Sequence, residues 1–190
     1  MKNINEMFRE IIALNEGGPT VAYKFSDPDG VRSGKSGWSF GLSQFDTQNN
    51  GQALACLREC GFTDAEIAGI VSQTVDVKPF AARLEANREV VDRYDMAQLQ
   101  HCLNAAGQFA ENYGIAIYDS HALLALADTV NQYGSLGNGT AAYCRQLQRP
   151  VTGPDILAMK LTWKYSQTRV GRADTIRRAD NIAKVVAYND

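Results

Sequence analysis

The chain has 190 residues, of which 45% are hydrophobic and 21% charged, and its formal net charge is −2. This length suits one domain that can bury a substantial core, so we predict a single domain over residues 1–190. No stretch is long and apolar enough to form a membrane-spanning helix, so we expect no membrane span. We expect no nucleic-acid partner either, and the net charge of −2 by itself says little about partners.

The first predicted element is an amphipathic helix that ends at Glu16. Its apolar residues recur at the spacing of one buried helical stripe: Ile4, Met7, Phe8, Ile11 and Ile12. Glu16 lies four residues after Ile12 and continues this face, and Gly17-Gly18-Pro19 then stops the helix. A carboxyl group held at a helix end and half turned toward the core suits a general acid. A capping or salt-bridged glutamate is the alternative interpretation.

Residues 20–46 lose this helical periodicity. The stretch Val21-Ala22-Tyr23-Lys24-Phe25 predicts a short strand, and turn-forming residues cluster at positions 26–30 and 33–37. Residues 38–46 then alternate aromatic or aliphatic side chains with small polar ones. We therefore predict a small, irregular β-hairpin region directly after Glu16, forming one wall of a cleft.

The rest of the sequence predicts helices with clear start and stop signals. Thr63-Asp64-Ala65-Glu66 is a capping box, and Thr152-Gly153-Pro154-Asp155 resembles a second capped start. The predicted helices cover residues 52–60, a segment from 63, one from Pro79 through Val91, one from Met96 to Gly114, one from Asp119 to Gly134, short helices after Gly139, and a last one to about Ala187. The predicted fold class is α+β and mostly α-helical, with a small N-terminal β-hairpin region and a helical lobe.

Several motifs resemble those of the lysozyme-like superfamily. They are Asn15-Glu16-Gly17-Gly18, the segment Ser36-Gly37-Trp38-Ser39-Phe40-Gly41 leading to Gln44-Phe45-Asp46, and Arg177-Arg178-Ala179-Asp180 near the C-terminus. The motifs resemble those of phage lysozymes (endolysins) and of the muramidase domain of pesticin. Residues 39–45 are also similar to the Gly-Leu-Met-Gln motif of goose-type lysozymes and lytic transglycosylases. In the resemblance to phage lysozymes and pesticin, Ser39 stands where those families have a threonine, and Asp46 stands at their aspartate.

The resemblance implies a lysozyme-like fold and a peptidoglycan-degrading muramidase, which cleaves β-1,4 bonds between N-acetylmuramic acid and N-acetylglucosamine. Glu16 would be the general acid, Ser39 and Asp46 would hold the attacking water, and Gln44 would contact substrate. An inverting enzyme separates its two carboxyl groups by about 6.5–9.5 Å. A lytic transglycosylase, the first alternative, would use Glu16 alone.

The second carboxylate has competing assignments. Phage lysozymes place theirs in the hairpin turn region, so Asp27 and Asp29 are alternatives to Asp46. Their proline and glycine neighbours also make them ordinary turn formers. Asp46, in turn, could be a cap of the helix that begins near Asn50.

Three residues at a predicted helix end are further candidates for polar contacts with the substrate. Asn131-Gln132-Tyr133, at a predicted helix end, would line the cleft across from Glu16, because phage lysozymes have a polar pair at a comparable place. A helix C-terminus explains these residues equally well. Four arginines give the C-terminal region a local positive face, for which a solvated helix surface is the simpler interpretation: Arg169, Arg172, Arg177 and Arg178.

The remaining expectations concern cysteines, cofactors and partners. The four cysteines show no metal-binding spacing and are expected to be small buried hydrophobic residues: Cys56, Cys60, Cys102 and Cys144. We expect no cofactor and no metal. The sequence has no signal-peptide pattern, so we expect synthesis in the cytoplasm and action on bacterial peptidoglycan after holin-type release or secretion-system delivery. An immunity or delivery protein is a further candidate partner. The second alternative function is a non-catalytic cell-wall-binding or virion protein on the same fold.

Overall fold

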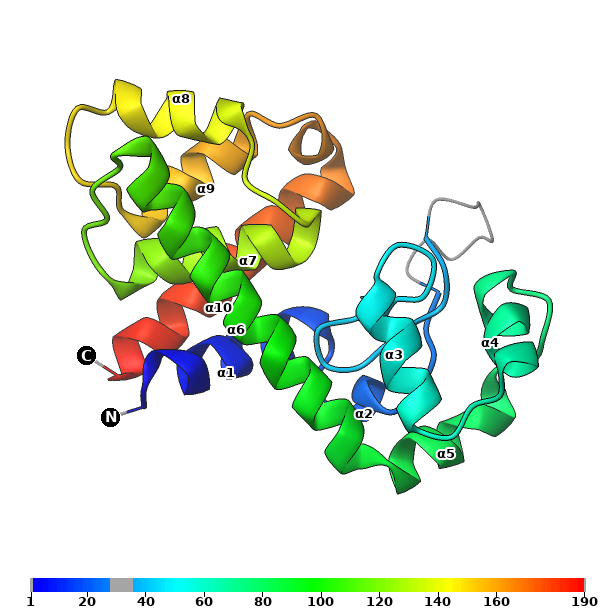
Figure 1. The fold of residues 1–190 in the computed structure, drawn as a ribbon. Helices are drawn as coiled ribbons and strands as arrows, with labels where there is room; N and C mark the ends of the chain where they lie inside the picture. The colour runs from blue at the N-terminus through cyan, green and yellow to red at the C-terminus, as the bar shows by residue number, and fades with distance from the viewer. Residues whose placement is uncertain (1, 28–35, 190) are drawn as a thin grey trace. The chain divides into compact units, whose positions relative to one another are not determined.

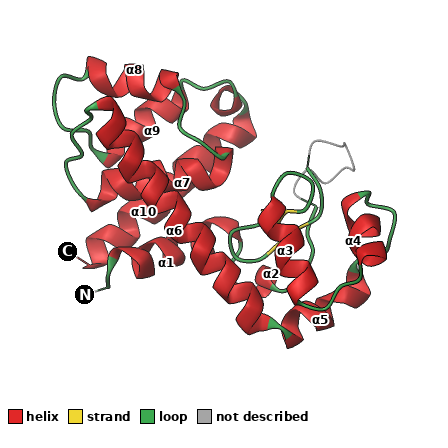
Figure 2. Ribbon diagram, viewed as in Figure 1, coloured by secondary structure: helices red, strands yellow, loops and turns green. Residues whose placement is uncertain are grey.

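Helices dominate the computed structural model, which describes residues 2–27 and 36–189 (Figures 1 and 2). Contacts divide the chain into two compact units, one made of Met1–Asn15 with Leu99–Asp190 and the other of Glu16–Gln98. One boundary falls directly before Glu16, and the other falls within helix α6 (Arg88–Tyr113). The predicted class, mostly helical with a small antiparallel sheet, is confirmed. The predicted turns at residues 28–35 lie outside the described residues.

Helix α1 (Ile4–Glu16) ends where the sequence predicted. Four of the five predicted stripe residues are buried, namely Met7, Phe8, Ile11 and Ile12. Gly17 and Gly18 follow with φ angles of 99° and 74°. This left-handed backbone is unfavourable for residues with a Cβ, so the pair of glycines allows the chain to turn sharply after Glu16.

The unit Glu16–Gln98 combines short helices with the sheet. Strands β1 (Ser39–Phe40) and β2 (Phe45–Asp46) pair antiparallel. The other elements are α2 (Pro19–Ala22), α3 (Gly51–Glu59), α4 (Asp64–Val71), the 3₁₀ helix η1 (Lys78–Phe80), α5 (Ala81–Ala86) and the first part of α6. Its core is aromatic around the sheet, where the Phe40 ring lies 5.4 Å from that of Phe25 and 5.7 Å from that of Phe45.

The strand predicted at residues 21–25 is wrong. Residues 19–22 form helix α2 instead, because a proline at its first position favours a helical start and Gly18 precedes it. The Ala22 carbonyl then accepts the Gly41 amide at 2.7 Å. Only Ser26 of this region pairs with the sheet, through an isolated bridge to Ser39.

The helix predicted from Pro79 through Val91 is also divided in the structure. Its first part is η1 followed by α5, and α6 begins at Arg88. The break is Asn87, whose backbone adopts φ −109° and ψ 31° and whose side-chain amide donates to the Arg83 carbonyl at 2.9 Å. Such local bonds from asparagine compete with the helical pattern. The capping box at Thr63 and Glu66 is confirmed.

The unit formed by Met1–Asn15 and Leu99–Asp190 is helical. Besides α1 and the second part of α6 it contains α7 (Ser120–Tyr133), α8 (Asn138–Gln146), α9 (Gly153–Leu161), η2 (Tyr165–Gln167) and α10 (Arg169–Asn189). Helices α7, α9 and α10 pack against one another (Figure 1). Asp119 caps α7, Gly134 ends it with φ 80°, and the Thr152 capping box starts α9, all as predicted.

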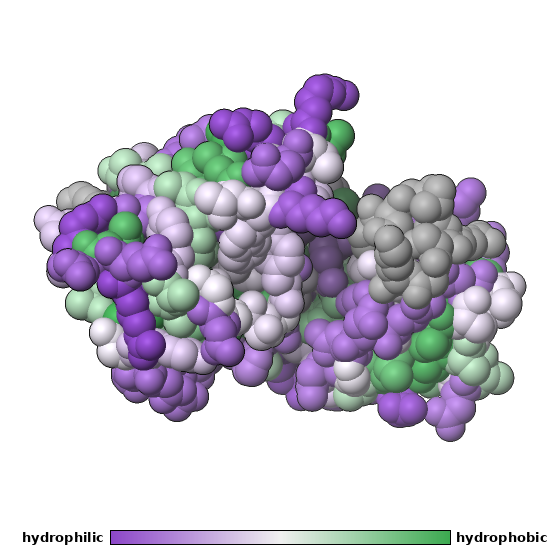
Figure 3. All heavy atoms as spheres, turned by 90° about the horizontal axis from the view of Figure 1, so that it is seen from above, coloured by the Kyte–Doolittle hydropathy of each residue, from purple (hydrophilic) through white to green (hydrophobic). Residues whose placement is uncertain are grey.

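The surface in view is mainly hydrophilic or weakly polar, with hydrophobic residues in small separate groups (Figure 3). The four cysteines are free and buried, which confirms their predicted role as hydrophobic core residues. Within residues 2–27 and 36–189, every helix is too short or too polar to cross a membrane.

Candidate functional site

Glu16 is the last residue of α1, and its side chain is half-buried. The two left-handed glycines after it redirect the chain within two residues. Thr20 closes this turn by donating its hydroxyl to the Gly17 carbonyl at 3.2 Å. The sequence thus places a carboxyl group at a helix end that is partly shielded from water, as a general acid requires.

Ser39 and Asp46 are brought together by the hairpin. They are direct partners in the register of β1 and β2. On its other edge Ser39 exchanges two backbone hydrogen bonds with Ser26, each 2.8 Å long. Ser39 is only 1% exposed. The Ser39 side chain is thus buried in the hairpin and is almost inaccessible to solvent.

The carboxylate of Asp46 organises the turn that follows β2. Its Oδ1 accepts the backbone amides of Gly37 at 2.9 Å and Gln48 at 2.8 Å, and its Oδ2 accepts the Asn49 side-chain amide at 2.6 Å. The helix cap itself is Asn50, whose side chain accepts the Gln52 amide. Asp46 is half-buried and firmly held, but it does not cap α3.

The Gln44 side chain stabilises the tight turn between the strands. Its Oε1 accepts the Ser26 hydroxyl at 2.6 Å, and its Nε2 donates to the Gly41 carbonyl at 3.0 Å. Both ends of the amide are thus engaged by the hairpin, and a sugar contact would have to compete with these bonds. The predicted substrate-binding role of Gln44 stays a prediction.

Asp27 remains a candidate for a second carboxylate. The side chain is half-buried, and its Oδ1 is shielded from solvent with no hydrogen-bond donor from the described residues. Asp29, the other alternative, lies outside the described residues.

The predicted pair of polar residues at the end of α7 belongs to the helical unit. The Gln132 amide is engaged at both ends, accepting from Lys160 Nζ at 2.9 Å and donating to Asp174 at 3.2 Å. Tyr133 is 41% exposed and stacks edge-on against Trp163 at 5.1 Å. The Asn131 Oδ1 atom is buried without a donor among the described residues. That these residues line a cleft across from Glu16 stays a prediction.

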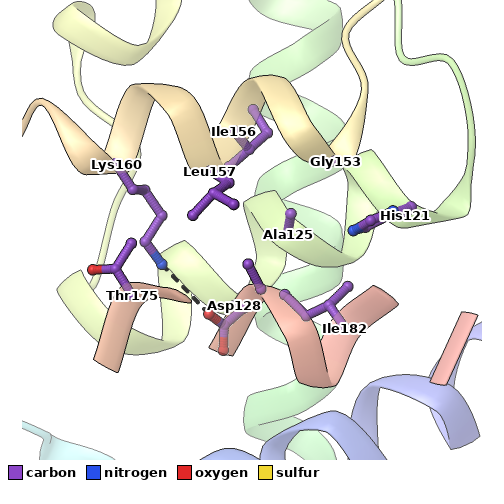
Figure 4. Close-up of a pocket in the computed structure, with 10 residues that line it drawn as sticks. His121, Ala125, Asp128, Gly153, Ile156, Leu157, Lys160, Thr175 and Ile182 are labelled. Carbon is purple, nitrogen blue, oxygen red and sulfur yellow. Dashed lines mark hydrogen bonds and ion pairs between the residues drawn. The ribbon is translucent and has the colours of Figure 1, made fainter. Parts of the chain in front are cut away.

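A buried charge cluster in the helical unit was not predicted from the sequence. Asp128 is 0% exposed and accepts from Arg178 Nη2 at 2.6 Å. Lys160 Nζ lies 3.5 Å from the same carboxylate (Figure 4). Arg178 is 4% exposed, so its interpretation as part of a solvated helix face is wrong. The missed signal was an acidic residue inside the apolar run of α7, where a buried charge requires a partner.

The electrostatics of this cluster follow from burial. Loss of water disfavours a charged Asp128, but the Arg178 and Lys160 cations outweigh this effect and hold its pKa below the ordinary value. For Lys160, burial lowers the pKa, and the Asp128 carboxylate only partly opposes that shift. The cavity beside the cluster has about 10 Å³, room for a water molecule rather than a substrate (Figure 4).

The same cluster holds the last turn of α1. Asn15 donates its side-chain amide to Asp128 Oδ1 at 2.9 Å and accepts from Asn181 at 2.9 Å. Arg177 donates to the carbonyls of Leu14 and Asn15 at 3.2 and 3.1 Å. The carbonyls at a helix C-terminus lack helical partners, so these bonds satisfy them and fix the residues that precede Glu16.

Neither a metal centre nor a known relative identifies the site. Among the described residues, no group of three or more histidine, cysteine, aspartate or glutamate side chains could hold a metal ion. No family model, no curated protein and no solved structure matches this chain. A function is therefore inferred from the residues themselves and from their geometry.

Proposed function

We propose that this chain is a peptidoglycan-degrading muramidase with Glu16 as its general acid. The observation that carries the proposal is the arrangement around Glu16: a half-buried carboxyl group ends an amphipathic helix, and a hairpin that pairs Ser39 with Asp46 follows. The motifs around these same residues resemble those of lysozyme-like families. The proposed partner is bacterial peptidoglycan, and the proposed fold family is lysozyme-like.

The chemistry requires few groups. Glu16 transfers its proton to the oxygen that leaves the cleaved glycosidic bond, while positive charge develops on the sugar ring. A water held by Asp46 and oriented by Ser39 attacks the anomeric carbon, and Asp46 takes the proton that this water loses. The products carry reducing muramic ends.

A lytic transglycosylase is the second candidate, and the contacts of Asp46 favour it. A carboxylate offers about four acceptor positions. Three donors, from Gly37, Gln48 and Asn49, already bind Asp46. If Asp46 serves only the turn, Glu16 acts alone, first as acid and then as base, and a hydroxyl of the sugar itself attacks to give anhydro-muramic ends.

The test is cleavage of purified peptidoglycan by the wild-type protein and by Glu16→Gln, with mass spectrometry of the released fragments. Glu16→Gln keeps the shape of the side chain but removes the acidic proton, so activity should fall at least about 10²-fold. Glu10→Gln is the matched control, because Glu10 lies in the same helix and forms a partly exposed ion pair with Lys2. Wild-type turnover by the Glu16→Gln protein would exclude the mechanism.

A further inference from the structure

Asp95 is a buried carboxylate on α6 that receives three hydrogen bonds from the turn between β1 and β2. Its Oδ2 accepts the Leu42 amide at 2.7 Å. Its Oδ1 accepts the Ser43 amide at 2.9 Å and the Ser43 hydroxyl at 2.6 Å. The residue is 2% exposed. Both carboxylate oxygens are therefore committed to a turn that lies more than fifty residues earlier in the chain.

No described lysine, arginine or histidine forms an ion pair with Asp95. Burial raises its pKa, and the hydrogen bonds from Ser43 and Leu42 oppose that rise only in part. A lone buried carboxylate is costly unless its oxygens are satisfied. Two consecutive backbone amides that converge on one anion form a nest, a known anion-binding concavity of the backbone. Here the anion is a side chain of the same chain.

The backbone of the turn between β1 and β2 approaches the Asp95 carboxylate closely. Gly41 has φ 78°, and a Cβ at this position would lie 2.9 Å from Asp95 Oδ1 and 2.7 Å from the Phe45 ring. Gln44 also adopts a left-handed backbone, with φ 55°. The left-handed conformation is freely accessible to glycine but unfavourable for Gln44. The conformation of Gly41 and Gln44 allows the backbone of the turn to approach Asp95 closely.

We propose that Asp95 is a positioning residue, whose carboxylate fixes the hairpin that carries Ser39 and Asp46. The inference rests on the muramidase function proposed above. Each strand has only two residues, and so short a hairpin is marginally stable by itself. The hydrogen bonds from Leu42 and Ser43 to Asp95 supply the rigidity that the two short strands lack. Displacing catalytic groups by about 1 Å can reduce a rate on the order of 10²-fold.

The experiment compares Asp95→Asn with Asp92→Asn in kinetics on soluble peptidoglycan fragments, normalised to folded protein. Asparagine would direct an amide NH₂ toward donors that need an acceptor. We expect kcat to fall about 10- to 10²-fold while KM changes less than about threefold. Asp92 lies one turn earlier on α6 and accepts the Tyr23 hydroxyl at 2.8 Å rather than the Leu42 or Ser43 donors, so its variant should keep wild-type kcat.

Amide hydrogen exchange of the turn gives a readout that does not depend on activity. In Asp95→Asn the Leu42 and Ser43 amides should exchange at least about tenfold faster, while amides in α3 should keep their wild-type rates. Ser43→Ala removes only the hydroxyl contact, so it should fold and show a smaller loss of kcat. It therefore decides the matter if Asp95→Asn does not fold.

The outcomes separate this inference from the proposed function. If Glu16→Gln is inactive but Asp95→Asn and Ser43→Ala keep wild-type kcat, the muramidase stands and the positioning role is overturned. Unchanged exchange at Leu42 and Ser43 overturns the anchoring itself. A wild-type protein that releases no fragments overturns the proposed function, and the catalytic role of Asp95 falls with it.

Discussion

Arg178 binds Asp128 through two hydrogen bonds in the core of the helical unit, from Nη2 to Oδ1 at 2.6 Å and from Nε to Oδ2 at 3.1 Å. Lys160 adds a second cation to the same carboxylate. Removing one partner from a buried ion pair leaves an uncompensated charge, which costs far more than the pair contributes. The pair is thus a sensitive point of the fold.

Arg178→Ala should lower the free energy of unfolding by about 3–5 kcal/mol, because Asp128 loses its main partner inside the core. Urea unfolding followed by circular dichroism measures this loss. Arg172→Ala is the control, since Arg172 is exposed on the same helix; its effect should stay within about 0.5 kcal/mol. A similar small effect for both variants would show that the cluster contributes little.

Stability should depend on Glu66 in acid. Hydrogen bonds from Arg83 and Thr63 lower the Glu66 pKa to about 2. The folded state therefore favours the charged form, so this contribution is fully present above the unfolded pKa of about 4.3 and is lost as the pH falls toward 2. Between pH 5 and pH 3, Glu66→Gln should lose less stability than the wild type in thermal unfolding. If the melting temperatures of the two proteins fall equally between pH 5 and pH 3, Glu66 makes no such contribution.

Gly153→Ala should destabilise the helical unit. A Cβ at Gly153 would lie 2.2 Å from the His121 ring, a contact that forces a shift (Figure 4). Overpacking of this kind costs about 1–3 kcal/mol. Gly139→Ala is the control, because nothing lies within 4 Å of its added methyl group. Adding His121→Ala to Gly153→Ala should restore part of the lost melting temperature, and no restoration would assign the loss to the backbone instead.

Asp46→Asn separates the two proposed mechanisms. In an inverting hydrolase the substitution removes the base, so turnover should fall at least about 10²-fold and wild-type fragments should carry reducing ends. In a transglycosylase the variant should stay active and anhydro-muramic ends should appear. Mass spectrometry of the fragments measures the product, and circular dichroism tests the fold, because Gly37, Gln48 and Asn49 also bind this carboxylate.

The helix ends could be predicted from the sequence because their signals are local. The capping boxes at Thr63 and Thr152, and the glycines that follow Glu16, act over four residues or fewer. The apolar stripe of α1 and the buried cysteines follow likewise from periodicity and residue type. The position of Glu16 at a helix end is therefore determined by the residues on either side of it.

The environment of the candidate site was decided only by tertiary structure. Residues 21–25 have the composition of a strand, yet residues 21 and 22 belong to helix α2, and only Ser26 pairs with the sheet. The Leu42 amide that binds Asp95 and the Arg178 side chain that binds Asp128 each lie about fifty residues away from their acceptor, and no local pattern records which distant group will satisfy a buried charge. Whether an aspartate lies in water or in a core depends on those partners, so its role emerges only when the chain has folded.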